Sequence, residues 1–484
     1  MYTTHTYQDW LATPEHERPE LALTIIRRYK SSAEYAHALE ASAYFANDNS
    51  AIKTKMLLKP VSVEVEEKRG NTNRIRKKSA VQEIAGNQIG SGYLFRFVTQ
   101  RSQFLLSNGV TLDDDKKKTA LGADFDGLLQ QLAESALVQG VSYAYYNADH
   151  VELLPAVRGT GNGFVGLLDE TTSALMIGIQ YWQLSKQRPL YVRIFEPEGV
   201  SVYRWGNKRM EQIQPRRAYK QTIRKDALGE DIIDGENYAG ALPIVPLYAD
   251  DDGIGMLTPS LKSKIDVYDR ILSDYADNLD RANDVYWVLN NFGGTTDDIV
   301  ELLEQINKIK AVANISDGTG NGSTAEPHTI EVPYEARRVA LDLLERAMYQ
   351  DAMALDMDAL TGGSLTNVAI NAASRNLHLA CDRLEWQVRR TVQGLLRLAD
   401  VETESIRFKR NGIANDSEII QDIYVFRDDI TREYALRLNP MVDDADIPDL
   451  LAAKDAEDET GEDDLDALEE AMKREQEERD AGAV

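Results

Sequence analysis

Two long helical patterns, at residues 258–284 and 334–357, constrain this 484-residue chain more than any other feature. The first opens with Thr258 in a capping position and Pro259 in the first turn, and its apolar residues then recur every three or four positions. At 1.5 Å per residue it predicts a rod of roughly 40 Å, which is long for one helix of a compact domain. The segment between the two patterns separates the two helices. We expect the second helix to run back along the first, so that the two form an antiparallel pair.

The segment between the two rods reads as a miniature α/β unit. It has expected strands at 285–291, 311–316 and 328–332, and an expected helix at 297–310. Residues 1–256 mix helical spacing, as at 21–45, with the alternation of strands and hairpins, and they predict one α+β domain. A third long helix is expected from about Val368 to Ala399, followed by a short strand and helical pieces.

The chain is strongly acidic, with a formal net charge of −26. Residues 455–480 hold 14 acidic and three basic side chains, and few aromatic residues accompany them, so we expect this tail to be mobile or only partly helical. The body is acidic as well, which argues against tight binding to DNA phosphates. Without an apolar run of about 18 residues or a signal peptide pattern, we expect a protein that is neither membrane-spanning nor secreted.

Sequence signals for catalysis are absent. The chain contains no Gly-x-x-x-x-Gly-Lys-Ser/Thr, His-Glu-x-x-His or Gly-x-Ser-x-Gly segment, and its six histidines do not cluster at metal-ligand spacing. The single cysteine, Cys381, lies in a helical pattern and is expected to be a small buried residue. We therefore expect no enzyme activity, no metal and no cofactor.

A repeated pentapeptide, Gly-Thr-Gly-Asn-Gly, occurs at 159–163 and again at 318–322. Glycine loops can cradle phosphate with backbone N–H groups, usually where a helix begins. Neither copy is followed by a helix-opening Lys-Ser or Lys-Thr. We interpret the first copy as a hairpin or loop turn among strands.

Motifs in a fixed order carry a resemblance to a known family. They include a Pro-x-Val-Pro strand at 243–246, a polar linker at 250–258 and an Ile-Asp-x-Tyr-Asp helix at 265–269. Later come the glycine-containing loop and long helix of 356–385, and a helical segment at 416–447 that contains Asn-Pro-x-Val-x-Asp. Across residues 20–455 the chain resembles the portal proteins of tailed bacteriophages, in particular those of siphophages that infect Gram-positive bacteria.

This resemblance implies an α+β portal fold assembled as a dodecameric ring at one capsid vertex, with double-stranded DNA passing through its centre. The implied parts are an N-terminal wing at 1–256, stem helices at 257–284 and 334–357, a clip at 285–333, a tunnel loop at 358–367, a long wing helix at 368–399, a crown at 400–455 and an acidic tail at 456–484. The protein would assemble in the host cytoplasm and end in the virion.

The resemblance also implies three candidate sites. The tunnel loop that narrows the channel would contain Thr361, Gly362, Gly363, Ser364, Leu365, Thr366 and Asn367. Stem acids that repel phosphate from the channel wall would be Asp266, Asp269, Asp274 and Asp277, although a merely solvated helix face is an equal interpretation. The clip loop that binds partner proteins would contain Ser316, Asp317, Gly318, Thr319, Gly320, Asn321, Gly322, Ser323 and Thr324.

The implied partners are other copies of the chain, terminase, a head-tail adaptor, and the major capsid and scaffold proteins. DNA would pass without sequence-specific contacts and no membrane would be involved. An alternative interpretation is an acidic virion scaffold or adaptor that binds only proteins, because the tail carries Leu465, Leu468 and Met472 on one apolar face.

Overall fold

The structure of the chain is a computed structural model. It describes residues 6–53, 61–69, 72–80, 86–159, 161–225, 231–238, 240–281, 285–290, 324–329, 334–357, 367–412, 416–426, 429–439, 441–442 and 446–453. The chain divides into two compact units, one of residues 1–354 with 377–411 and one of residues 355–376 with 412–484.

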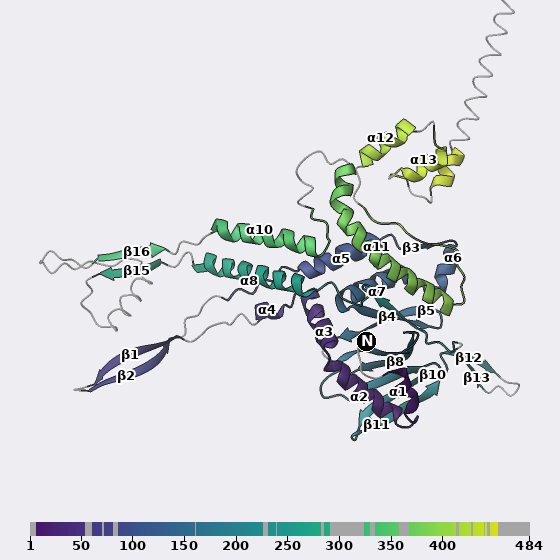
Figure 1. Ribbon diagram of the computed structural model, residues 1–484, viewed down its shortest axis with the longest axis horizontal. Coiled ribbons are helices and arrows are strands. Elements are labelled where there is room, and N and C mark those ends of the chain that lie inside the picture. Colours follow the sequence, from purple (N-terminus) through teal and green to yellow (C-terminus); the bar gives the residue numbers. More distant parts are fainter. Residues whose placement is uncertain are drawn as a thin grey trace, which may run out of the picture. The chain divides into compact units, whose positions relative to one another are not determined.

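The first unit contains a six-stranded antiparallel meander (Figure 1). Its strands are β6 (Val157–Arg158), β7 (Asn162–Leu168), β8 (Leu175–Trp182), β9 (Tyr191–Glu196), β10 (Gly199–Gly206) and β11 (Arg209–Arg217), paired in sequence order. The described residues of the first glycine pentapeptide lie at the turn between β6 and β7 and at the start of β7; Arg158 pairs with Asn162, and Gly159 has a φ of 62°. A positive φ is readily available to glycine. The predicted hairpin turn is confirmed.

Helices cover one face of the meander. They are α1 (Tyr7–Ala12), α2 (Arg18–Lys30) and α3 (Ala33–Phe45), and they share a core with the strands that includes Trp10, Ile26, Ile179 and Tyr181. The single helical pattern expected at 21–45 is two helices, because Ser32 caps α3 by accepting a hydrogen bond from the Tyr35 N–H.

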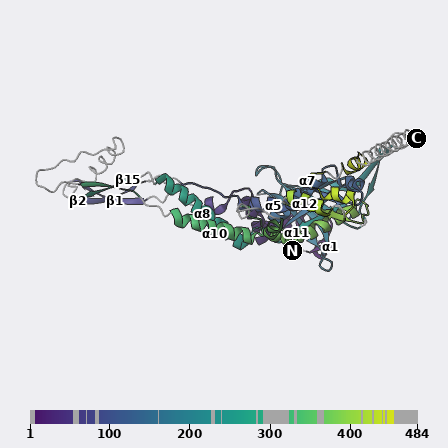
Figure 2. The same cartoon turned by 90° about the horizontal axis from the view of Figure 1, so that it is seen from above.

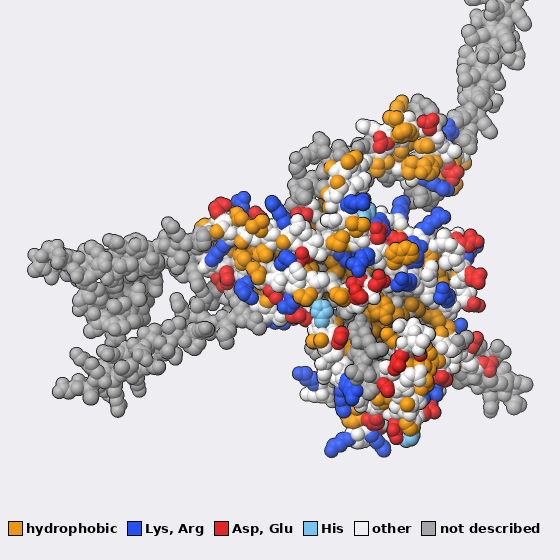
Figure 3. All heavy atoms as spheres, in the orientation of Figure 1, with side chains coloured by type: hydrophobic (Ala, Val, Ile, Leu, Met, Phe, Trp, Pro, Cys, Tyr) orange, Lys and Arg blue, Asp and Glu red, His pale blue; other side chains and the backbone are white. Residues whose placement is uncertain are grey.

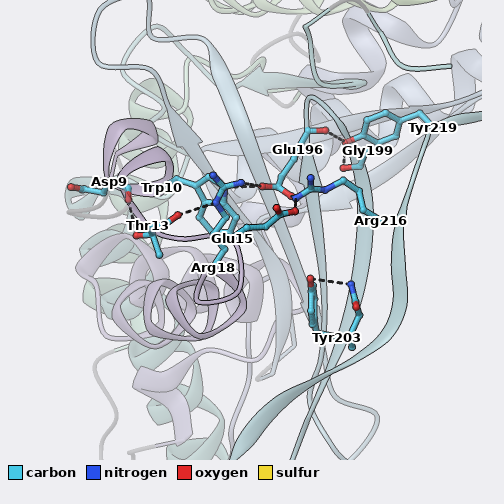
Figure 4. Close-up of polar contacts among 11 residues, drawn as sticks. Asp9, Trp10, Thr13, Glu15, Arg18, Glu196, Gly199, Tyr203, Arg216 and Tyr219 are labelled. Carbon is cyan, nitrogen blue, oxygen red and sulfur yellow. Dashed lines mark hydrogen bonds and ion pairs between the residues drawn. The ribbon is translucent and has the colours of Figure 1, made fainter. Parts of the chain in front are cut away.

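A buried carboxylate joins α1 and α2 to the meander (Figure 4). Glu196, which is 3% exposed, accepts hydrogen bonds from Trp10 Nε1 at 2.9 Å and Arg18 Nη1 at 2.9 Å through Oε1. Its Oε2 accepts from Arg216 Nη2 at 2.7 Å. Both oxygens of the carboxylate therefore have cationic donors, which compensates for the cost of burying the charge.

A three-stranded sheet packs on the other face of the meander. It has the order β14 (Ile244–Tyr248), β4 (Val141–Asn147) and β5 (His150–Pro155). The Tyr143 ring lies 4.3 Å from that of Phe164, centroid to centroid, and joins the two sheets. Helices α5 (Tyr93–Leu106) and α7 (Phe125–Gln139) pack together, and α7 also packs on β4 and β5.

The third long helix, α11 (Asn367–Leu398), confirms the expected helix from Val368 almost to the residue. Its part from Leu377 onward belongs to the first unit and packs on β14, where Thr391 Oγ1 donates to the Pro246 carbonyl at 3.1 Å. A Cβ at Gly394 would lie 2.9 Å from Val245 Cγ1, so glycine permits this close approach. Cys381 is buried in α11, as expected.

The two expected rods are α8 (Pro259–Arg281) and α10 (Tyr334–Asp351). Thr258 Oγ1 accepts from the Leu261 N–H, which confirms the predicted cap. The second rod ends at Asp351 and not at 357: Met353 has a left-handed φ of 49°, and the buried Arg101 side chain donates to the Ala352 carbonyl at 2.6 Å. The helical pattern in the sequence continues to residue 357, but tertiary contacts end α10 at Asp351.

Short elements complete the first unit. They are α4 (Ser50–Lys53), α6 (Asp115–Lys118), a 3-10 turn (Thr119–Leu121), and the antiparallel pairs β1 (Val61–Arg69) with β2 (Thr72–Ala80), β3 (Val110–Leu112) with β17 (Ile406–Phe408), β12 (Lys220–Lys225) with β13 (Asp231–Glu236), and β15 (Val285–Asn290) with β16 (Thr324–Thr329). The strand predicted at 328–332 therefore begins four residues earlier, at Thr324. The helix expected at 297–310 lies outside the described residues.

The second unit contains the first residues of α11 together with α12 (Asp416–Phe426) and α13 (Arg432–Leu438), and residues 447–453 are also helical. Thr431 caps α13 by accepting from the Tyr434 N–H at 3.3 Å. These elements confirm the helical pieces that the sequence predicted after the third helix. The mixture of sheets and helices confirms the α+β class.

Candidate functional site

The antiparallel pair of α8 and α10 carries the sequence-predicted stem residues, and Figures 1 and 2 show the two helices side by side. The beginning of α8 meets the end of α10, where Ser260 Oγ donates to Asp351 Oδ2 at 2.7 Å and Lys264 pairs with the same carboxylate. At the other end the rings of Tyr275 and Tyr334 meet edge to face, with centroids 5.9 Å apart. The predicted antiparallel arrangement is therefore present.

Aromatic residues of α5 join the helix pair to the rest of the first unit. Tyr93 meets the ring of Tyr268 on α8 at 5.1 Å, and Phe97 meets the ring of Tyr349 on α10 at 5.2 Å. The Tyr93 hydroxyl donates to Glu345 Oε1 at 2.7 Å, and burial is the main cause that raises its pKa far above the usual value. Helix α5 thus contacts both long helices near one end of the pair. These contacts hold that end of the pair in place.

The first two predicted stem acids have partners within the unit. Asp266 pairs with Lys262 at 3.0 Å and accepts a hydrogen bond from the Tyr44 hydroxyl of α3. Asp269 is fully buried, and it accepts from the Ser91 N–H at 2.9 Å through Oδ1 and from Asn49 Nδ2 through Oδ2. Burial is the largest cause that raises the pKa of the Asp269 carboxyl, opposed by the hydrogen bonds from Ser91 and Asn49.

The other two stem acids differ in exposure. Asp277 is buried, 7% exposed, and its Oδ1 accepts from the Asn87 N–H at 2.7 Å. Asp274 is half-buried and lies one helical position away from the buried stripe. Within one subunit, Asp269 and Asp277 therefore bind backbone and do not present their charge to solvent. The channel-wall role of the four acids stays a prediction.

Asp269, Ser273 and Asp277 together form a polar stripe on α8 that holds the segment 87–91. The N–H groups of Asn87, Ile89 and Ser91 donate to Asp277, Ser273 and Asp269 in turn. Four helix residues rise 6 Å and two extended residues about 6.6 Å, so every second residue of the segment meets every fourth residue of the helix. The stripe therefore provides hydrogen-bond acceptors for three backbone N–H groups that are not part of a β-sheet.

Asp269 also joins two places that are distant in sequence. Asn49 precedes α4, and Ser91 immediately precedes Gly92 and α5, so one carboxylate binds the chain on both sides of the excursion that contains β1 and β2. Sequence analysis did not identify Ser273, Asn49 or segment 87–91 as partners of these acids. The i, i+4, i+8 spacing of the stripe was the available signal, because it places three polar residues on one helix face.

The other two predicted sites fall mostly outside the described residues. Of the tunnel loop, only Asn367 is described, as the first residue of α11. Of the clip loop, only Thr324 is described, at the start of β16 opposite Asn290. The roles of both loops stay predictions.

The described ranges contain neither a metal-ligand cluster nor a membrane-spanning helix. Their histidine, cysteine and carboxylate side chains form no group of three or more with the arrangement of a metal site. In the same part of the chain, no helix combines the length and apolar character that crossing a membrane requires.

The chain is similar in sequence to known proteins. The sequence matches the family described as phage portal protein, SPP1 Gp6-like, over residues 28–478. The portal protein of Clostridium phage phiCD119 is 28% identical over 190 residues, which cover 38% of this chain and 42% of that protein. The match therefore spans less than half of that relative's length.

A second relative aligns over more of the chain. The portal protein of Bacillus phage SPP1 is 24% identical over 385 residues, which cover 72% of each chain. The order of sequence motifs, the α+β fold and the family match over most of the sequence agree with one another. The chain belongs to the SPP1 Gp6-like family of phage portal proteins.

Proposed function

We propose that the protein forms a ring, dodecameric as the resemblance to portal proteins implies, at one vertex of a phage capsid, and that double-stranded DNA passes through its centre during packaging and ejection. The observation that supports this most directly is the antiparallel pair of α8 and α10, rooted in α5 at one end and joined through residues 285–333 at the other. Such pairs, repeated around a rotation axis, form the wall of a tube.

The charge of the chain fits a conduit better than a DNA-binding site. Each subunit carries a formal charge of −26, and tight non-specific binding to DNA requires lysine and arginine that neutralise phosphates. A wall of negative charge weakens such contacts and lets the duplex slide. The ring needs no catalytic group of its own, because a terminase would supply the work of packaging.

The partners of this ring are terminase, a head-tail adaptor, and the capsid and scaffold proteins. It assembles in the host cytoplasm and remains in the virion. Negative-stain electron microscopy of the purified chain tests the proposal: rings with a central hole are expected. Monomers or filaments under all assembly conditions would instead support the acidic adaptor that binds only proteins.

Among the stem acids, Asp274 provides the sharpest test of a repelling channel wall, because its substitution leaves the buried stripe intact. We expect Asp274→Lys to leave rings intact but slow packaging or increase DNA retention. Glu170→Lys makes the same charge change at an exposed turn between β7 and β8 and serves as the control. Equal packaging by both variants and the unmodified ring would remove Asp274 from the wall.

The two glycine-containing loops have different proposed roles. Thr361 to Asn367 form a tunnel loop that bends as DNA passes, with Gly362 and Gly363 providing the freedom to bend. Replacement of both glycines by proline should impair packaging in rings that still assemble. Ser316 to Thr324 form a partner-binding clip loop, so deletion of Gly318 to Gly322 should weaken terminase and adaptor binding; unchanged binding would contradict this role.

A further inference from the structure

A cavity of about 450 Å³ opens beside the meander, on the face that also packs on β5. Its floor includes Gln180 and Trp182 of β8 and Arg193 of β9, with Gln180 directly opposite Arg193 across the two strands. Residues 153–155 of β5 form a wall, and Leu184 lies at the rim with 81% of its surface exposed. Figure 3 shows hydrophobic side chains gathered near β5.

The charge of the cavity differs from that of the chain as a whole. The chain has 80 acidic and 54 basic residues, yet the described residues that line the cavity include Arg158 and Arg193 and no carboxylate. Arg193 stacks on Trp182, with its guanidinium carbon 5.6 Å from the ring centroid, and Arg158 is exposed. Neither guanidinium is paired with a carboxylate in the described part of the chain. The cavity therefore suits an anionic group next to an apolar one.

A second cavity of about 540 Å³ shares Leu153, Pro155 and Arg158 with the first. Its other lining residues include the apolar Phe45 and Val138 and also Glu134, whose Oε1 already accepts hydrogen bonds from Ser102 and Gln130. Arg158 thus stands between two cavities that each combine polar and apolar lining residues, and we call the whole the two-pocket groove. A peptide in extended conformation, advancing about 3.3 Å per residue, reaches from one apolar site to a neighbouring one within a few residues.

Each cavity also contains a buried polar atom without a partner. Gln180 Oε1 in the first and Ser135 Oγ in the second make no hydrogen bond within the described residues. Buried oxygens of this kind are rarely left unsatisfied in native structures.

We propose that the two-pocket groove is a docking site for an extended acidic protein segment. Leucine-sized side chains of the segment enter the two cavities, and a carboxylate between them pairs with Arg158. This site lies on the sheets and is separate from the clip loop of the proposed function. The chain's own residues 462–472, with six acidic residues and no basic one around Leu465 and Leu468, have the required composition and provide a probe.

Fluorescence anisotropy with a labelled peptide of residues 462–472, added to the full-length protein, tests the docking site. We expect saturable binding that weakens with added salt, and a loss of at least about tenfold in affinity, or 1.4 kcal/mol, for Arg158→Glu. Arg209→Glu, an exposed arginine of β11 outside the groove, is the matched control and should retain binding. Equal losses in both variants would indicate non-specific attraction and overturn the proposal.

Two further measurements identify what the groove recognises. A peptide with serine in place of Leu465 and Leu468 should bind at least tenfold more weakly; if it binds equally, and inorganic phosphate displaces it, the groove is only an anion site. A photo-reactive benzoylphenylalanine at Leu184 should crosslink to the added peptide or to the acidic segment of another copy. The absence of both crosslinks, identified by mass spectrometry, would overturn the proposal.

Discussion

Two buried carboxylates of the first unit are stabilised in different ways. Glu196 receives its hydrogen bonds from the indole of Trp10 and from two guanidinium groups, of Arg18 and Arg216. Asp269 is paired with no cation in the described part of the chain and receives a backbone N–H from Ser91 and the amide of Asn49. The first joins helices to the meander, and the second joins α8 to chain segments around the β1 and β2 excursion.

The difference in donors separates the two roles. An ion pair with several cationic donors fixes side chains whose own charges need a partner. Its loss leaves Arg18 without a carboxylate partner in the described part of the chain and leaves Arg216 with Glu15 alone. A carboxylate that accepts hydrogen bonds from backbone N–H groups acts as the carbonyl groups of a neighbouring strand would act. It therefore fixes the path of the main chain. We therefore expect loss of Glu196 to affect global stability most, and loss of Asp269 to affect a local segment.

The largest effect should follow Glu196→Gln. The side chains of Arg18 and Arg216 are 19% and 30% exposed, and each loses a charged partner in this variant, so we expect a decrease of about 3 kcal/mol in the free energy of unfolding in urea. Glu211→Gln is the control, because its pair with Arg204 lies at the surface and should contribute less than about 1 kcal/mol. A similar decrease in the free energy of unfolding for both variants would contradict the global role assigned to Glu196.

A smaller and more local effect should follow Asp269→Ala. The N–H of Ser91 and the amide of Asn49 lose their acceptor, which costs about 1–3 kcal/mol when such groups stay buried. Hydrogen exchange measured by mass spectrometry should become faster in peptides that contain residues 86–92. Asp274→Ala, on a half-buried position of the same helix, should leave that exchange unchanged. Uniformly faster exchange throughout the protein would instead assign Asp269 a global role.

The smallest effect concerns pH. The folded state raises the pKa of Asp269, mainly by burial, so the stability that this group contributes is complete below about pH 3.9 and is lost as pH rises through its folded pKa. Urea unfolding between pH 4 and 7 should show the stability of the protein, relative to Asp269→Asn, falling as pH rises.

Asp351 is the last residue of α10 and lies beside the beginning of α8. Its pKa is shifted in the opposite direction to that of Asp269. Burial, the largest single cause, raises the pKa of Asp351, but hydrogen bonds from Lys264 and Ser260 together lower it below its usual value. Its contribution is therefore present above about pH 3.9 and lost as pH falls through the folded pKa. The stability relative to Asp351→Asn should fall toward acid pH; slopes of the same sign for the two variants would contradict these assignments.

Much of the fold was predictable from local sequence, because periodicity and caps act over a few residues. Thr258 and Pro259 marked the start of α8, and the pattern from Val368 gave α11 almost completely. The continuous pattern at 21–45 concealed the break at Ser32, and the pattern through 357 concealed the end of α10. Both errors arose because apolar spacing continues across a point where a cap or a distant side chain ends the helix.

The candidate site was less predictable. The spacing of Asp269, Ser273 and Asp277 showed that they share a helix face, but an acidic face is compatible with solvent, a channel or another part of the chain. The partners, Asn49 and residues 87–91, lie about 180 or more positions away in the sequence. Hydrogen bonds between such distant residues follow from the packing of α8, which no local pattern encodes.

The sequence by itself determined the α+β class, the two long helices with a separate segment between them, the turn at Gly159 and the family, since each follows from residue types at fixed spacing. Only the tertiary structure decided which stem acids are buried and which buried oxygens lack partners. Burial and hydrogen bonding depend on what covers a residue. That neighbour comes from elsewhere in the chain, so the three-dimensional path of the backbone sets the environment of each charge.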